Sequence, residues 1–236
     1  MKVFENINRW RSEGRKVIVP LVDPDRYDPS FIDSLKGRAA DVPMLFVGGS
    51  VVTSDTDSVV RDIKARLGAD VVLFPGDYSQ VSQSADAILF LSLLSGRNPE
   101  YLIGQQVKSA PVIRRLGIET ISTAYLLIDG GRVTSVQYVS NTQPLPADKP
   151  DLVLATAIAA QMLGFRMIYL EAGSGAARPV SPDVIKAVRS AVSLPIIVGG
   201  GLRSAEAVKA AFDAGADMVV VGTAFEQNPD LAKVIL

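Results

Sequence analysis

The fold is decided by the stretch Ile196-Ile197-Val198-Gly199-Gly200-Gly201-Leu202-Arg203-Ser204 and its partner Met218-Val219-Val220-Val221-Gly222-Thr223-Ala224. In each, a short apolar run rich in β-branched residues ends directly in glycine. Continuous rather than alternating hydrophobicity is typical of a parallel strand that is covered on both faces. The helical pattern Ser204–Ala214 follows the first run, so strand and helix alternate as in a βαβ unit.

Six further runs of the same kind precede this pair: Lys16–Val22, Pro43–Val47, Val71–Phe74, Ala87–Leu91, Ile118–Ile128 and Met167–Leu170. Helical patterns lie between several of them, including Thr56–Leu67, Leu152–Leu163 and Pro182–Val192. Eight such strands in 236 residues favour a closed (β/α)₈ TIM barrel over an open doubly wound sheet. We therefore expect one α/β domain over residues 1–236.

Two segments depart from a regular barrel. Residues 77–85 are polar and too short for a crossover helix, so we expect a loop in place of the third helix. After Ile128, the turn signal Asp129-Gly130-Gly131 precedes the alternating run Arg132–Val139. This pattern predicts an added hairpin strand.

Composition removes many kinds of chemistry. The chain has no cysteine and no histidine, which excludes disulfides, thiol nucleophiles, imidazole bases and Cys- or His-ligated metals. Lys and Arg number 24 against 25 Asp and Glu, so no basic surplus favours nucleic acid. The start, Met1–Trp10, lacks the apolar run of a signal peptide, and the longest apolar stretch, Leu152–Ala160, is too short for a membrane span. We expect a cytoplasmic protein.

The glycines after the seventh and eighth strands predict a phosphate-binding site. Without side chains, Gly200, Gly201 and Gly222 let backbone amides approach an anion, and the start of the following helix favours negative charge. Phosphate sites of TIM barrels are typically built from these two loops. The alternative is that the glycines only form tight turns.

A carboxylate ends the sixth strand, in the run Tyr169-Leu170-Glu171-Ala172-Gly173-Ser174-Gly175. At the carboxyl end of a barrel strand, Glu171 is expected to face the mouth of the active site, where it can bind a hydroxyl or accept a proton. The glycine-rich loop after it can hold a polyol and a phosphate together. The alternative for Glu171 is a structural salt bridge.

Two aspartates flank a proline at the end of the first strand, in Leu21-Val22-Asp23-Pro24-Asp25. Carboxylates at this edge suit a hard divalent cation, Mg²⁺ above all, with Asp23 as the ligand and Ser50 after the second strand completing the shell. The alternatives are an Asp-Pro turn with Asp25 as a helix cap, and Ser50 as a cap of the next helix.

An apolar segment follows the third strand. Residues 87–103 begin as a strand, break at Gly96–Pro99 and continue into a helical pattern. The segment can line a groove for a long apolar ligand, although core packing explains the same composition. For Tyr125 on the fifth strand, a place in the core is the simpler interpretation.

Taken together, these blocks resemble the geranylgeranylglyceryl phosphate synthase family. The resemblance covers almost the whole chain, and the motifs that carry it are Leu21–Asp25, Val47–Ser50, Leu73–Gly76, Tyr101–Gln106, Tyr169–Gly175, Val198–Ser204 and Val221–Thr223. Some bacterial relatives carry a lysine two residues before the first aspartate. Leu21 at this position favours the branch that contains the archaeal-type enzymes.

The resemblance implies a modified TIM barrel without a regular third helix, assembled as a homo-oligomer. It implies Mg²⁺-dependent transfer of a long-chain prenyl group, geranylgeranyl by default, from its diphosphate to sn-glycerol 1-phosphate. By this resemblance, Asp23 and Ser50 are the residues expected to bind Mg²⁺. Binding of sn-glycerol 1-phosphate falls to Tyr169, Leu170, Glu171, Ala172, Gly173, Ser174, Gly175, Gly200, Gly201, Gly222 and Thr223.

We hypothesise that Asp23 binds the metal that neutralises the leaving diphosphate. Glu171 contacts the attacking hydroxyl, either as the base that deprotonates it or as a group that positions it. Two alternatives share the glycine motifs. One is a barrel of the phosphoribosyl isomerase type, and the other is a non-catalytic barrel that binds a phosphosugar. The first predicts acid–base residues at other strand ends, and the aspartates of the first strand argue against the second.

Overall fold

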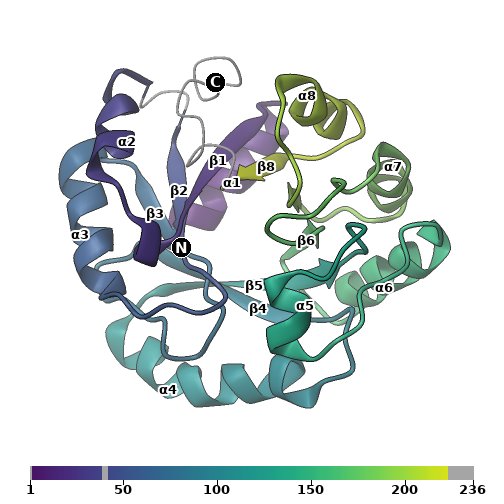
Figure 1. Cartoon of the computed structure of the whole chain (residues 1–236), viewed down its shortest axis with the longest axis horizontal. Coiled ribbons are helices and arrows are strands. Elements are labelled where there is room, and N and C mark those ends of the chain that lie inside the picture. The colour runs from purple at the N-terminus through teal and green to yellow at the C-terminus, as the bar shows by residue number, and fades with distance from the viewer. Residues whose placement is uncertain (1, 39–41, 223–236) are drawn as a thin grey trace.

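The barrel is closed. The computed structural model describes residues 2–38 and 42–222, and its eight strands pair in parallel and in chain order, with the last strand joining the first (Figure 1). The strands are β1 (Val17–Val22), β2 (Met44–Val47), β3 (Asp70–Leu73), β4 (Ala87–Leu93), β5 (Glu119–Leu127), β6 (Met167–Glu171), β7 (Ile196–Gly199) and β8 (Met218–Val221). The prediction of a TIM barrel is confirmed.

The helices form a ring around the strands (Figure 1). They are α1 (Lys2–Ser12), α2 (Pro29–Ser34), α3 (Thr56–Leu67), α4 (Gln105–Leu116), α5 (Ser135–Ser140), α6 (Pro150–Met162), α7 (Pro182–Ala191) and α8 (Ala205–Asp213), with the short η1 (Pro24–Arg26), η2 (Lys36–Arg38) and the π-helical η3 (Glu100–Gly104). None of the helices within the described ranges combines the length and the apolar character that crossing a bilayer requires.

The strands are apolar on both faces because each face packs in a different core. In β2, Leu45 and Val47 belong to the outer core between strands and helices, whereas Met44 and Phe46 belong to the core inside the barrel. Successive side chains of a strand point to opposite faces. Double burial therefore explains why the sequence shows continuous apolar runs without alternation.

Helix α1 closes the amino-terminal end of the barrel. Its side chains Val3, Ile7 and Trp10 are buried and belong to the core inside the barrel. The Glu119 carboxylate, at the start of β5, accepts hydrogen bonds from the amides of Val3 (2.9 Å) and Phe4 (3.1 Å). A carboxylate at a helix N-terminus also meets the positive end of the helix dipole. The opposite, carboxyl end of the barrel is left for a binding site.

Residues 74–86, between β3 and β4, form a loop without a helix, as the sequence predicts. The loop is nevertheless ordered by side-chain hydrogen bonds. Gln80 is buried, its Nε2 donates to the Gly49 carbonyl (2.9 Å), and its Oε1 accepts from the Gly76 amide (3.1 Å). One glutamine thus joins the loops that follow β2 and β3.

The predicted hairpin strand Arg132–Val139 is wrong. The turn at 129–131 exists, with the Gly131 amide donating to Asp129 Oδ1 (2.8 Å), but the chain then forms α5, which ends at Asn141 in the left-handed region (φ 49°). A hairpin strand needs a free sheet edge. Both edges of β5 are occupied, by β4 and β6, because the barrel is closed.

Candidate active site

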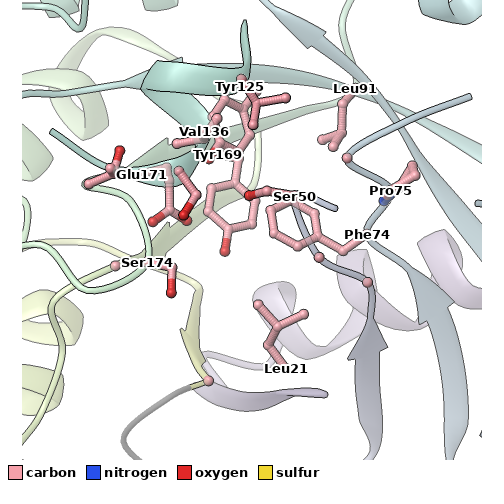
Figure 2. Close-up of a pocket in the computed structure, with 18 of the residues that line it drawn as sticks. Leu21, Ser50, Phe74, Pro75, Leu91, Tyr125, Val136, Tyr169, Glu171 and Ser174 are labelled. Atoms are coloured by element: carbon pink, nitrogen blue, oxygen red, sulfur yellow. The ribbon is translucent and has the colours of Figure 1, made fainter. Parts of the chain in front are cut away.

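A cavity of about 870 Å³ lies at the carboxyl ends of the strands. Its wall combines residues from the loops after β1, β2 and β3 with the ends of β6, β7 and β8. Figure 2 shows Glu171 and Ser174 on one side of Tyr169, and Phe74 and Leu91 on the other. The side chains singled out in the sequence and an apolar wall therefore share one cavity.

The conformation of the glycine loop after β7 depends on the absence of side chains. Gly200 and Gly201 have φ of 80° and 72°, a region that side chains strongly disfavour. A Cβ at Gly200 would clash with Glu171 Oε1 and lie 2.6 Å from the Gly173 amide nitrogen. Gly222 also lines the cavity, while Thr223 lies outside the described residues. The glycines therefore do more than form tight turns, because their lack of side chains lets the backbone of this loop approach the Glu171 carboxylate.

Glu171 is a buried carboxylate at the mouth of the barrel. It is 5% exposed, and its Oε1 accepts the Gly173 amide at 2.6 Å. Burial raises the pKa of Glu171 to about 7, against the lowering effect of the hydrogen bond from Gly173 and of the Tyr169 hydroxyl. Within residues 2–38 and 42–222 Glu171 joins no ion pair, so the salt-bridge alternative is not met there. A carboxyl group that titrates near neutrality is suited to proton transfer.

Three aromatic rings divide the cavity. Tyr169 stacks on Phe74, with ring centres 5.1 Å apart and planes at 5°, and on Tyr125, with ring centres 5.4 Å apart. Burial, and then the charge of Glu171, raises the pKa of Tyr169 well above its usual range, so the hydroxyl stays protonated. Among the described atoms this buried hydroxyl has no hydrogen-bond acceptor in good geometry. The hydroxyl therefore keeps an unused donor beside the Glu171 carboxylate.

The run Tyr169–Gly175 does not act as one block. Tyr169, Glu171, Ser174 and Gly175 line the cavity. The side chains of Leu170 and Ala172 are buried in the outer core instead, because successive residues of β6 alternate between the two faces. Gly173 contributes its amide to Glu171. The side chains of Leu170 and Ala172 therefore do not line the cavity, and Gly173 has none.

Asp23 and Ser50 both line the cavity. Asp23 caps η1 through a 3.0 Å hydrogen bond from the Asp25 amide, and a Cβ at Gly49 would lie 3.3 Å from its Oδ1. Asp23 therefore sits against the loop that carries Ser50. The alternative prediction made Asp25 the helix cap, but in the structure Asp23 is the residue that caps η1.

The carboxylate of Asp25 is hydrogen-bonded to the neighbouring loop. It accepts hydrogen bonds from the amides of Thr53 (3.0 Å) and Ser54 (2.7 Å) and from the Thr53 hydroxyl (3.0 Å). These hydrogen bonds lower the pKa of Asp25 to about 2. In the part of the chain that the structure describes, no three Asp or Glu side chains cluster as metal ligands. A cation at Asp23 would need Ser50 and substrate oxygens to complete its shell.

Sequence reasoning missed several contributors to the site. Phe74 belongs to the motif Leu73–Gly76 and directly follows β3, but the sequence pattern gives it no role in the site. Arg132 enters the wall from the loop after β5, a segment assigned to a hairpin by its pattern. For Gln80, no local pattern indicates its bridging role.

The fold and the site together define a TIM barrel whose cavity, at the carboxyl ends of the strands, combines a glycine loop, a buried carboxylate and an apolar wall. The PcrB family model matches residues 5–235, and the chain belongs to this family.

Relatives and solved structures agree with this assignment. A geranylgeranylglyceryl phosphate synthase of Chitinophaga pinensis is 48% identical over 98% of this chain and 93% of its own length, and one of Thermococcus kodakarensis is 43% identical over 94% and 88%. The crystal structure of (S)-3-O-geranylgeranylglyceryl phosphate synthase from Thermoplasma acidophilum in complex with its substrate sn-glycerol-1-phosphate superposes with a TM-score of 0.91, at 38% identity over 100% of this chain and 96% of that one. Orotidine 5'-phosphate decarboxylase of Pyrococcus horikoshii, 16% identical with a TM-score of 0.57, shares the fold alone.

Proposed function

We propose that this protein is a prenyltransferase that joins sn-glycerol 1-phosphate to geranylgeranyl diphosphate, forming an ether-linked geranylgeranylglyceryl phosphate and releasing diphosphate. Full-length similarity to enzymes of that name, from bacteria and archaea, supports the proposal. The observation that carries it is the composition of one cavity. A glycine cradle, a buried carboxylate with a pKa of about 7 and an apolar wall meet there.

Glycerol phosphate is assigned to the glycine side of the cavity. Backbone amides at Gly200 and Gly201 bind the phosphate, and Ser174 and Tyr169 offer hydroxyls to the glycerol. Glu171 orients the attacking hydroxyl and accepts its proton. As the new bond forms between this oxygen and C1 of the prenyl chain, the bond from C1 to the diphosphate oxygen breaks, and the diphosphate leaves with the electron pair.

The prenyl chain is assigned to the wall formed by β4 and η3. Leu89, Leu91 and Leu93 of β4 and Tyr101 of η3 line the cavity there. The Tyr169, Phe74 and Tyr125 rings lie between this wall and the glycine side. Aromatic faces attract cations, so the stack suits the positive charge that develops on the allylic carbon.

Mg²⁺ is part of the proposal. One carboxylate, one hydroxyl and substrate phosphates form the kind of oxygen shell that this ion accepts, and Asp23 and Ser50 fit the two protein positions. When bound, Mg²⁺ supplies Lewis-acid neutralisation of the diphosphate. Asp23 is itself held in place by the Asp25 amide and packs against the loop of Gly49.

The test is a butanol-extraction assay with labelled sn-glycerol 1-phosphate and geranylgeranyl diphosphate. We expect labelled lipid with Mg²⁺ and none after chelation, whereas an isomerase or a binding-only barrel yields none in either case. Asp23→Asn should remove the Mg²⁺-dependent activity. Asp28→Asn is the matched control, because Asp28 caps α2 away from the cavity.

Three outcomes would contradict the proposal. Absence of lipid product with the wild-type protein removes the prenyltransferase assignment. Product formation that is unchanged by chelation, or an Asp23→Asn variant with unchanged metal dependence, removes the metal from Asp23.

Location, assembly and chain length complete the proposal. It includes a cytoplasmic, homo-oligomeric enzyme, which cell fractionation and light scattering test. Competition between farnesyl, geranylgeranyl and longer diphosphates tests the preferred prenyl length.

A further inference from the structure

The loop between β5 and α5 packs tightly against the loop that follows β6. The Arg178 amide donates to the Gly130 carbonyl (3.0 Å), and a Cβ at Gly130 would lie 2.6 Å from that of Ala176. Thr134, 5% exposed, packs against Gly173 so closely that a Cβ there would lie 2.5 Å from the threonine methyl. These contacts fix the backbone from which Arg132 projects.

Arg132 lies over the substrate side of the cavity. Its side chain lines the cavity, and a Cβ at Gly175 would lie 2.7 Å from Arg132 Nη2. Within residues 2–38 and 42–222, its guanidinium makes no hydrogen bond and no ion pair. The two other arginines that line the cavity are placed differently. Arg203 donates to the Ala176 carbonyl (2.8 Å), and the Arg26 Nε lies 4.0 Å from Asp23.

The glycines of the cradle carry no full charge, and the guanidinium of Arg203 beside them is already hydrogen-bonded to the carbonyls of Gly175 and Ala176. Gly200, Gly201 and Gly175 offer only backbone amides, which carry partial charges, whereas a phosphate monoester carries nearly two negative charges near neutral pH. A guanidinium presents paired donors that match a phosphate in geometry and charge. Arg132 is placed to add these donors next to Gly175.

We propose that Arg132 is a substrate-binding residue that contacts the phosphate of the polyol phosphate and sets its affinity. This inference rests on the proposed function. Arg132 reaches Gly175 in the loop after β6, whereas Asp23 and Ser50 follow β1 and β2, which pair with neither β5 nor β6. Arg132 therefore serves the glycerol phosphate rather than the diphosphate.

The test compares Arg132→Gln and Arg132→Lys with the wild type and with Arg178→Gln. Arg178 is an exposed arginine of the adjacent loop that does not line the cavity. Titration calorimetry with sn-glycerol 1-phosphate alone should show about tenfold or more weaker binding for Arg132→Gln, the range for loss of a hydrogen bond to a charged group. Arg132→Lys should be intermediate, and Arg178→Gln should stay within about twofold of the wild type.

Steady-state kinetics supply a second readout. The KM for sn-glycerol 1-phosphate should rise with Arg132→Gln, while the KM for geranylgeranyl diphosphate and the melting temperature stay unchanged. Wild-type affinity in Arg132→Gln, or a rise confined to the KM for the diphosphate, would overturn the inference. A wild-type protein that does not bind sn-glycerol 1-phosphate at all is a different result, because it contradicts the proposed function itself.

Discussion

Ionisation of Glu171 affects the stability and the activity of the protein in opposite directions. Its burial favours the protonated form in the folded protein, whereas the unfolded chain loses the proton at an ordinary glutamate pKa. Between that value and about pH 7, the folded state binds more protons than the unfolded state, so stability from this group falls as pH rises. A base must be ionised, so activity is expected to rise over the same window.

Glu171→Gln separates these effects. Glutamine keeps the shape and the acceptor for the Gly173 amide but cannot accept a proton. We expect kcat to fall about a hundredfold or more, and the rise of kcat/KM with pH toward about 7 to disappear. At pH 8 the variant should be more stable than the wild type by up to about 3 kcal/mol in chemical denaturation.

The control for this experiment is Asp213→Asn, which removes an exposed carboxylate paired with Lys209. It should keep wild-type kinetics and pH dependence. Near-normal turnover by Glu171→Gln would reduce Glu171 to a positioning group, and a wild-type rate independent of pH would contradict its assigned ionisation.

Gly200 is a second residue at which close contacts with neighbouring atoms leave no room for a side chain. Gly200→Ala combines a disfavoured positive φ with a clash at Glu171, so we expect at least tenfold weaker binding of sn-glycerol 1-phosphate, measured by calorimetry. Gly14→Ala is the matched control, since Gly14 has φ of 69° but no atom within 4 Å of an added Cβ. Equal affinity in both variants would mean that the clash is relieved without loss of the site.

At the scale of elements, the sequence predicts most of what the backbone does. Double burial makes the eight strands visible as apolar runs, and the short polar segment at 77–85 correctly excludes a third helix. The pattern of Arg132–Val139 fails: alternation over eight residues favours a half-buried strand over a helix, yet residues 135–140 form the short helix α5. Closure of the barrel, a long-range property, decides between them.

The residues of the candidate site differ in the same way. Residues that end strands, such as Asp23, Glu171 and Gly200, are predictable because parallel strands bring their carboxyl ends together. Gln80 and Arg132 act through contacts between different loops, and no local pattern records these contacts. Likewise, no local pattern shows that the Asp25 carboxylate is bound by the loop of Thr53 and Ser54, while Asp23 caps η1.

The junction of β5 and α5 offers a test of stability. Thr134 precedes α5, but its hydroxyl makes no capping hydrogen bond and is buried without a partner among the described atoms. Thr134→Val keeps the contact with Gly173 and removes that unpaired group, so its free energy of unfolding should match or exceed that of the wild type by up to about 1 kcal/mol. Thr134→Ala should lose about 1 kcal/mol of packing. A valine variant less stable than alanine would show that the hydroxyl is bonded.

At the scale of the whole molecule, the barrel divides its two ends between stability and binding. Helix α1 fills the amino end with Val3, Ile7 and Trp10, while the carboxyl end keeps an open cavity. Binding at that open end is linked to folding, because a ligand that binds only the folded state stabilises it. The substrate side is rigid, since Glu171 on β6 pairs directly with Gly199 on β7.

This rigidity predicts that stabilisation by ligand depends on chirality. With sn-glycerol 1-phosphate at about a hundred times its Kd, the free energy of unfolding should rise by about 2.7 kcal/mol, measured by urea denaturation. The enantiomer sn-glycerol 3-phosphate carries the same charge, but with its phosphate in the glycine cradle it cannot place both of its hydroxyls where those of sn-glycerol 1-phosphate would lie. At equal concentration it should stabilise the protein clearly less, and inorganic phosphate less again. Equal effects of the two enantiomers would mean that the cavity grips the phosphate alone, and that Glu171 does not hold the glycerol.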